Sequence, residues 1–286
     1  MQKIIFLIQC ADRKGLLASI STFFYEKGFN ILHCQQHSDT RTNRYYMRLE
    51  LDLKDLKITR EELQDNFGQF AHPLGLDWHC YFTDNKSRVA ILVSKTSHCL
   101  FDLLSRHHEG NLICAIPLII SNHPTLEHIA TQFKIPYYHL PIVAGDKAQQ
   151  EKAVQELLEE HKIDLVVLAR YMQVLSPAFT KKWWGKMINI HHAFLPAFQG
   201  ANPYLQAYER GVKMIGATAH YVTDELDQGP IIEQDVVRIN HELTPIGLRN
   251  IGRDVEQAVL SRAVQAHLEH RIILWGNRTV VFNAEY

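Results

Sequence analysis

Two polar side chains, Asn189 and His191, interrupt the apolar segment MINIHH. Alternation along a β-strand would place both of them on one face and His192 on the other. An amide and a protonated imidazole can each donate a hydrogen bond to an oxygen that gains negative charge when a carbonyl is attacked. The pattern therefore indicates acyl-group chemistry, although hydrogen bonding of both side chains to loop backbone at a strand end is an equally simple interpretation.

A carboxylate follows a second predicted strand, ATAHYV, which carries Thr218 and His220 on one face. The acidic turn TDELDQGP comes next and contains Asp227. A carboxylate in this place can position or deprotonate a nucleophile, whereas most acidic turns are simply solvated. The sequence contains no G-x-S-x-G nucleophile elbow. We therefore expect the attacking group to be an external amine or water rather than a side chain.

Nearly continuous apolar runs occupy the middle of the chain: VAILVS, LICAIPLIIS and DLVVLAR. Such runs are typical of parallel strands that are covered on both faces. Predicted helices separate and follow them, at residues 98–108, 125–133, 149–161 and 244–270. This alternation predicts an α/β domain with a Rossmann-like, mostly parallel sheet, in which ligands bind beyond the carboxyl ends of the strands. No G-x-G-x-x-G or Walker A motif supports a nucleotide site.

The first 84 residues follow a different pattern. Four predicted strands, IIFLIQC, NILHCQQH, RYYMRLELDL and WHCYFTD, surround two predicted helices. Thr59 and Glu62 have the spacing of a capping box at the start of the second helix. The order βαββαβ is that of a ferredoxin-like domain. We therefore expect two domains, residues 1–84 and 85–286, joined at the polar stretch DNKSR.

The composition argues against several classes of partner. A formal net charge of −1 in 286 residues gives no overall attraction to nucleic acid. No apolar run reaches the roughly 18 residues that a membrane span requires. The five cysteines include no C-x-x-C pair, and the amino-terminal residues lack the layout of a signal peptide. We expect a cytoplasmic protein with reduced thiols and no nucleic-acid or membrane partner.

Asn189-Ile190-His191 with the following Leu195-Pro196, and HYVTDELDQGP further on, resemble the folate-dependent formyltransferase family. The similarity extends from about residue 88 to the carboxyl terminus. It implies 10-formyltetrahydrofolate as the reacting folate, with no additional cofactor and no metal. It also implies that Asn189 and His191 hold the formyl oxygen. Asp227 would orient and deprotonate the nucleophile or relay its proton to the departing N10, with His220 and Thr218 as supports behind the reacting groups.

A third segment of the family pattern, LARYMQVLS, follows the run DLVVL. The resemblance implies a pterin-binding loop that acts largely through backbone groups, with the acidic turn closing the other side. The residues concerned are Met172, Gln173, Val174, Leu175, Thr223, Asp224 and Glu225. Taken alone, Met172–Leu175 is better explained as a helix start that packs into the core.

The amino-terminal stretch ADRKGLLASIS resembles an ACT domain, a ferredoxin-like fold that often binds small amino acids at a paired interface. An ACT domain joined to a folate formyl domain is the arrangement of the formyltetrahydrofolate deformylases, in which water replaces the amine and the products are formate and tetrahydrofolate. This resemblance implies formate supply for purine biosynthesis, balanced folate pools, a homo-oligomer and a small amino-acid effector. The expected effector contacts are Asp12, Gly15, Leu16, Asn30 and Ile31. A simpler role for Asp12 is capping of the following helix.

Three other interpretations stay open. The chain could transfer the formyl group to an unidentified amine. Lys95, Thr96, Ser97 and His98 stand in place of the Gly-rich phosphate loop of the glycinamide ribonucleotide enzyme, yet Lys95 and the hydroxyls could still bind an anion. His191, His220 and Asp227 could instead be metal ligands of a hydrolase. A non-catalytic amino-acid sensor is the third, against which the intact Asn-His-Asp set argues.

Overall fold

A computed structural model describes residues 2–142, 146–197 and 203–284, and its chain divides into two compact units. One unit comprises Met1–Lys86 with Glu269–Ile273 and Val280–Tyr286, and the other comprises Ser87–Leu268 with Leu274–Thr279. The sequence interpretation assigns the whole carboxyl-terminal region to the second domain, so the two descriptions differ at these tail segments. Within the described ranges, no helix combines the length and apolar character of a membrane span.

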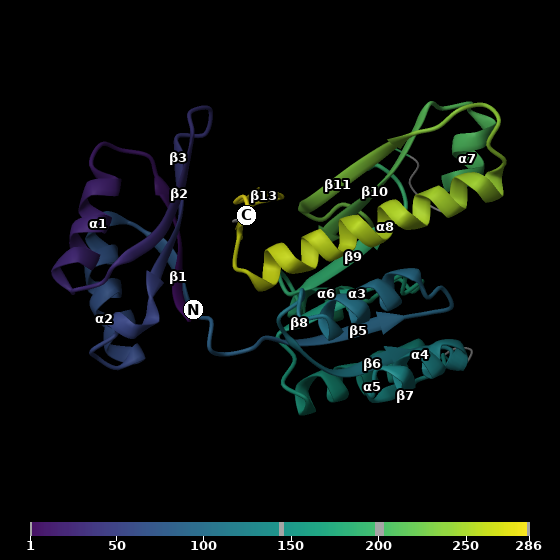
Figure 1. The fold of residues 1–286 in the computed structure, drawn as a ribbon, viewed down its shortest axis with the longest axis horizontal. Coiled ribbons are helices and arrows are strands. Elements are labelled where there is room, and N and C mark those ends of the chain that lie inside the picture. Colours follow the sequence, from purple (N-terminus) through teal and green to yellow (C-terminus); the bar gives the residue numbers. More distant parts are fainter. Residues whose placement is uncertain (1, 143–145, 198–202, 285–286) are drawn as a thin grey trace. The chain divides into compact units, whose positions relative to one another are not determined.

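The first unit is an antiparallel four-stranded sheet of order β2-β3-β1-β4 with helices α1 and α2 on one face (Figure 1). Its elements are β1 (Lys3–Ala11), α1 (Leu16–Glu26), β2 (Ile31–Asp39), β3 (Arg44–Asp52), α2 (Arg60–Ala71) and β4 (Asp77–Phe82), with short 3-10 turns at Leu53–Asp55 and His72–Leu74. Phe6, Phe24 and Phe67 pack ring to ring in its core. The expected βαββαβ order and the Thr59–Glu62 capping box are both confirmed.

Arg48 of β3 explains why the tail joins the first unit. Its Nε donates to the carbonyl of His270 at 2.9 Å, and its Nη2 donates to the carbonyl of Glu269 at 3.0 Å. The ring of His270 also stacks on Tyr81 of β4, with centroids 3.8 Å apart. These contacts join residues far apart in the chain, so no local pattern could have predicted them.

The second unit holds a seven-stranded sheet of order β11-β10-β9-β8-β5-β6-β7. The strands are β5 (Arg88–Val93), β6 (Ala115–Ser121), β7 (Tyr137–His139), β8 (Leu165–Leu168), β9 (Met187–His191), β10 (Met214–Tyr221) and β11 (Ile231–Arg238). The five strands β7, β6, β5, β8 and β9 are parallel to their neighbours in the sheet. β10 is antiparallel to β9, and β11 is antiparallel to β10. The expected mostly parallel, Rossmann-like sheet is confirmed.

Helices cover this sheet and leave its carboxyl ends to the loops. They are α3 (His98–His108), α4 (Glu127–Gln132) after a 3-10 turn at Pro124–Leu126, α5 (Lys147–Glu160), α6 (Pro177–Lys182), α7 (Pro203–Glu209) and α8 (Pro245–Leu268). α5 and α6 bury apolar side chains against β5, β6 and β8. α8 packs along β9, β10 and β11 and against α3 (Figure 1). The chain ends in the hairpin strands β12 (Ile272–Trp275) and β13 (Arg278–Val281).

Candidate active site

Strand pairing brings the predicted reacting residues together. β8 and β9 are parallel, and Leu168 pairs with Asn189, so the loop after β8 begins beside the end of β9. β10 is antiparallel to β9, which places His220 opposite Asn189 and Thr218 opposite His191. Side chains that face each other across a strand pair are close enough to interact. The sheet therefore brings Asn189 and His191 next to His220, although the two segments are about 30 residues apart along the chain.

A cavity of about 300 Å³ opens at this end of the sheet. The predicted site residues that line it share one rim, formed by the β8 loop, the end of β9 and the turn after β10. They are Asn189, His191, His220, Asp227, Met172, Gln173, Val174, Leu175, Thr223, Asp224 and Glu225. Arg170 and His192 also line the cavity, although the sequence interpretation assigns neither a role there.

The contacts of His220 determine which hydrogen bonds Asn189 can make. His220 Nδ1 lies 2.9 Å from the carbonyl oxygen of Tyr221, which can only accept, so this nitrogen carries a proton. In the neutral ring Nε2 is then an acceptor, and it lies 3.3 Å from Asn189 Nδ2. The amide of Asn189 is thereby oriented, and its second N–H is left for a ligand.

Asp227 lies between the two imidazoles. Its Oδ2 is 3.2 Å from His191 Nδ1 and its Oδ1 is 3.6 Å from His220 Nε2. Burial raises the pKa of the Asp227 carboxyl, but the hydrogen bond from His191 and the interaction with the nearby His220 ring outweigh burial and hold that pKa below its ordinary value. The carboxyl group is therefore ionised at neutral pH.

The far nitrogen of His191 has no hydrogen-bond partner among the described residues. His191 is 5% exposed, and its Nε2 is buried without a hydrogen bond. An unsatisfied polar atom inside a protein is costly unless a ligand or water completes it. Since Nδ1 faces Asp227, the ring is oriented for Nε2 to meet a bound substrate.

Thr218 does not line the cavity; its hydroxyl bonds to backbone groups of the turn beside the cavity. Its hydroxyl donates to the carbonyl of Ala193 at 2.9 Å and accepts from the backbone N–H of Leu195 at 3.0 Å. Gln234 Nε2 also donates to that hydroxyl, at 2.9 Å. These bonds hold the turn that follows His191.

The backbone of the acidic turn is held in an unusual conformation. Asp227 has a φ of 57°, in the left-handed region that few non-glycine residues adopt. At Gly229 a Cβ would lie 1.7 Å from the carbonyl oxygen of Tyr221, so only glycine fits this close approach. A register shift opposite Ala219 and His220 marks a bulge in the β10–β11 pairing, where β11 carries the extra residue, Ile232. Such features cluster at functional sites, where they aim a side chain.

The loop after β8 is irregular rather than helical. The alternative in which Met172 begins a helix packed into the core is wrong, because Met172 is 59% exposed and α6 starts only at Pro177. Ser94, at the end of β5, accepts from the backbone N–H of Met172 at 3.1 Å and donates to Asn122 Oδ1 at 2.7 Å. Ser94 was missed by sequence reasoning, although a polar residue closing the run VAILVS was a usable signal.

The predicted effector residues lie at the two ends of α1. Gly15 begins the helix with a φ of 89° and no side-chain cap, so the simpler role of Asp12 as N-cap is wrong. Asp12 and Gly15 follow the end of β1, whereas Asn30 and Ile31 lie beyond the other end of α1, an 11-residue helix about 16 Å long. Within one chain these residues do not meet. Leu16 is buried in the core.

Comparison with known proteins assigns both units. The formyl transferase family matches residues 87–264, and the ACT domain family matches residues 4–68. A formyltetrahydrofolate deformylase of Synechocystis is 50% identical over 276 residues, which cover 96% of this chain and 97% of that protein. One from Bacillus subtilis is 44% identical over 278 residues, covering 97% of this chain and 93% of that protein.

Solved structures agree with the sequence matches. The crystal structure of a formyltetrahydrofolate deformylase from Pseudomonas syringae has a TM-score of 0.96 to this chain at 43% identity. The alignment covers 99% of this chain and 95% of that one. The likeness therefore includes both units and is not limited to the formyl transferase part.

Proposed function

The chain belongs to the formyltetrahydrofolate deformylase family, and on that premise we propose that it hydrolyses 10-formyltetrahydrofolate to formate and tetrahydrofolate. It is an enzyme of the hydrolase class, acting on a C–N bond of a linear amide. The observation that carries the site assignment is the single cavity that gathers Asn189, His191 and Asp227 with both predicted folate segments. Formate made in this way would supply purine biosynthesis and balance the one-carbon folate pools.

The reaction begins with water attack on the formyl carbon. Asp227 holds the water and accepts one proton as the C–O bond forms. The carbonyl oxygen becomes an oxyanion, to which the free N–H of Asn189 and the protonated Nε2 of His191 donate. Charge on the oxyanion in turn raises the proton affinity of the nearby Asp227, which offsets its low resting pKa.

Collapse of the tetrahedral intermediate breaks the C–N10 bond. The electron pair of that bond remains on N10, and the proton taken up by Asp227 is delivered there, which regenerates the carboxylate. Formic acid is left and loses its proton to solvent at neutral pH. The exposed side chains of Met172 and Val174 and the backbone of Thr223–Asp227 provide the surface on which the pterin rests.

Two rival reactions are less well supported, one because of the geometry and the other because of the relatives. In a metal-dependent hydrolase, His191 and Asp227 would direct lone pairs at a common ion, but here they face each other at 3.2 Å and their bond holds the ring in place. A transferase would need a place for an amine beside Asp227. The deformylase relatives favour water as the nucleophile.

The remaining expectations concern the setting of the enzyme. We propose a cytoplasmic protein, supported by five free cysteines, and a reaction that needs no cofactor beyond its folate substrate. We also propose a homo-oligomer in which a small amino acid binds between two ACT domains. Two features support this site: the helix N-terminus at Gly15 carries no side-chain cap, and Asp12 and Asn30 could meet only across two copies.

A direct assay separates hydrolysis from transfer. Purified protein is incubated with 10-formyltetrahydrofolate alone, and in parallel with a panel of primary amines, while formate and formylated amine are measured. Hydrolysis predicts formate in equal amount to tetrahydrofolate without any amine. Turnover that requires an amine would instead identify a transferase.

A further inference from the structure

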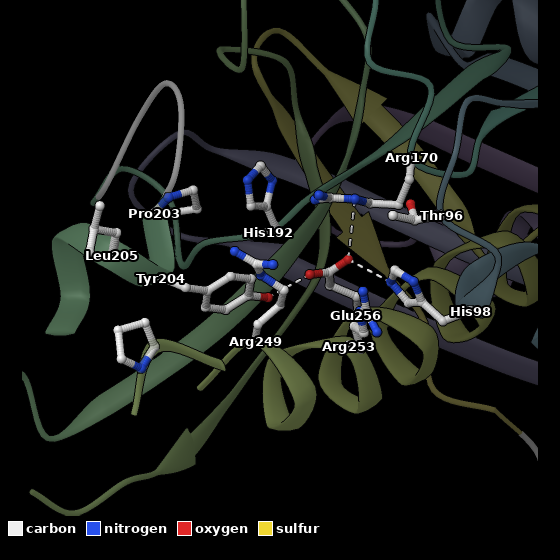
Figure 2. A pocket seen from close by; sticks show the side chains of 11 residues that line it. Thr96, His98, Arg170, His192, Pro203, Tyr204, Leu205, Arg249, Arg253 and Glu256 are labelled. Atoms are coloured by element: carbon white, nitrogen blue, oxygen red, sulfur yellow. Dashed lines mark hydrogen bonds and ion pairs between the residues drawn. The ribbon is translucent and has the colours of Figure 1, made fainter. Parts of the chain in front are cut away.

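A second cavity, of about 390 Å³, lies against the first within the same unit. Arg170 and His192 line both cavities, so the two spaces share these side chains as a common wall. Figure 2 shows the guanidinium of Arg170 directed toward His192 at this wall. The other side chains of the second cavity that matter here are Thr96, Arg249, Arg253 and Glu256.

The second cavity carries an excess of positive charge. Arg170, Arg249 and Arg253 face a single carboxylate, Glu256, which is 1% exposed. Burial, followed by the charge of Arg170, lowers the pKa of His192 to about 3, so that this ring is neutral at pH 7. Three arginines and one carboxylate leave a net attraction for anions, which solvent screens least at the mostly buried Arg170.

Glu256 accepts some of the hydrogen bonds available in this cavity and leaves other donors without an acceptor. It accepts from the Tyr204 hydroxyl and lies 2.8 Å from His98 Nε2 and 3.5 Å from Arg170 Nε (Figure 2). Among the described residues, Arg170 Nη1 and the hydroxyl of Thr96 are nonetheless buried without a hydrogen bond, and Arg170 Nε has only its ion pair with Glu256. The side chain of Arg170 is only 13% exposed. Buried donors without acceptors are rare, and a guanidinium pairs best with a planar carboxylate.

A cation fits this cavity poorly. His98, Cys99 and Glu256 form a cluster whose ligand atoms all lie within 4.8 Å of one another. Glu256 is already bonded to His98, however, and the guanidinium of Arg170 lies beside it. Burial raises the pKa of the Cys99 thiol well above its ordinary value, so the thiolate form that binds metals is disfavoured.

We propose that the second cavity is a binding site for a small carboxylate anion and that it receives formate as formate leaves the reacting groups. The identity of the ligand rests on the proposed function, because formate is the anionic product made on the other side of the shared wall. Formate is small enough to pass beside Arg170, whose Nη1 has no hydrogen bond in the described part of the chain and can donate to a formate oxygen. Arg253 is half-buried and Arg249 is exposed, so the positive charge continues toward solvent.

Formate binding to the full-length protein tests this site without any turnover. Saturation-transfer NMR of formate, titrated in the absence of folate, gives its Kd for wild type and for the double variant Arg249→Met/Arg253→Met. The expected result is a Kd raised by about fivefold or more in the double variant. Arg262→Met is the matched control, because Arg262 also lies on α8 but pairs with Asp235 outside the cavity, and it should stay within about twofold of wild type.

A competition arm on the wild-type protein keeps the test decisive if the double variant does not fold. A non-hydrolysable folate analogue should fill the first cavity and leave the formate signal in place. Complete displacement of formate by the analogue would overturn the proposal, as would equal Kd values in the double variant and the control. Inorganic phosphate binding about tenfold more tightly than formate would assign the cavity to a phosphate ligand instead, and so also overturn it.

The result is independent of the enzymatic assay. If the protein binds formate at the second cavity but releases none from 10-formyltetrahydrofolate, the anion site stands and the proposed hydrolysis does not. If the protein releases formate but binds none at the second cavity, the proposed hydrolysis stands and the proposed anion site does not.

Discussion

At the scale of single residues, the bond from His220 Nδ1 to the carbonyl of Tyr221 decides what Asn189 can do. This bond holds the imidazole of His220, whose Nε2 in turn orients the amide of Asn189. One N–H of that amide is left for the formyl oxygen. His191 is oriented in the same manner by Asp227. The two donors are therefore held in place before substrate arrives, which is the arrangement that stabilises an oxyanion most.

Loss of either donor should slow the chemical step. Asn189→Ala and His191→Ala should each lower kcat by roughly 10²–10³, the usual cost of one preorganised donor. Steady-state kinetics of formate release gives this number, and the KM for folate should change far less. A change confined to KM would mean that these side chains bind the substrate without stabilising the transition state.

Asp227→Asn separates proton transfer from binding. The amide is nearly isosteric and can still accept from His191 Nδ1, so the turn should stay folded and folate affinity should hold within about tenfold. It cannot take the proton of water, so kcat should fall by roughly 10²–10⁴. Formate release and binding of a non-hydrolysable folate analogue are measured together.

Glu225→Gln is the matched control for that variant, since Glu225 lines the same cavity two residues away. It should keep near-normal turnover. If Glu225→Gln were inactive and Asp227→Asn active, the base would be Glu225. Full activity of both variants would mean that neither Asp227 nor Glu225 is the general base.

Residue types and alternation predicted much of the site, and their limit is visible at His192. The pattern MINIHH correctly pairs Asn189 with His191, but alternation also sends His192 to the other face. β9 ends at His191, so His192 lies beyond the strand and lines both cavities. Glu256 and Arg170 could not be connected from the sequence, because 86 positions separate them and only the packing of α8 brings them together.

At the scale of elements, the apolar runs identified the parallel strands because burial on both faces leaves little freedom of composition. The expected helix over 98–108 matches α3, whereas the expected helix over 125–133 is divided into a 3-10 turn and the short α4. The left-handed backbone of Arg170 and Asp227 carried no sequence signal. Glycine is the residue that usually marks such a conformation, and neither position has it.

The contact between α8 and β10 should make stability depend on pH. His267 of α8 is partly buried, and its Nδ1 lies 2.7 Å from the Tyr221 hydroxyl. Burial, followed by the charge of Lys186, lowers the pKa of His267 to about 4. Between the ordinary value near 6.5 and pH 4 the unfolded chain therefore binds more protons, so the free energy of unfolding falls as the pH falls.

The expected loss from this histidine is about 1–2 kcal/mol between pH 7 and pH 5. Urea unfolding of wild type and His267→Gln across this range measures it, because Gln retains an acceptor for the tyrosine and does not titrate. The variant should show a shallower dependence on pH. His241→Gln, at an exposed loop position, serves as the control, and identical slopes in all three proteins would contradict this role of His267.

At the scale of the whole molecule, removal of residues 1–84 is a poor test of regulation. The first unit includes Glu269–Ile273, where Ile272 and Ile273 are buried, and Phe282 nearer the end is buried too. Deleting the amino-terminal part would expose these side chains and destabilise the chain for reasons unrelated to an effector. Single substitutions in the full chain avoid this problem.

Asp12→Ala should weaken binding of the proposed amino-acid effector by about fivefold or more, since Asp12 would meet the ammonium group while the N-terminus of α1 meets the carboxylate. Titration calorimetry with a panel of small amino acids measures the affinity. Asp65→Ala, on the exposed face of α2, is the matched control and should bind as wild type does. Equal weakening in both variants, or no binding by wild type, would contradict an effector site at α1.

The origin of the oxygen in formate tests whether water is the attacking group. Purified protein is given 10-formyltetrahydrofolate alone in water enriched in oxygen-18, and the formate is analysed by mass spectrometry. Hydrolysis predicts a single labelled oxygen in formate released in equal amount to tetrahydrofolate, at a rate that falls by about a hundredfold or more in Asp227→Asn. Unlabelled formate, or none until an amine is added, would contradict hydrolysis at the Asn189, His191 and Asp227 site.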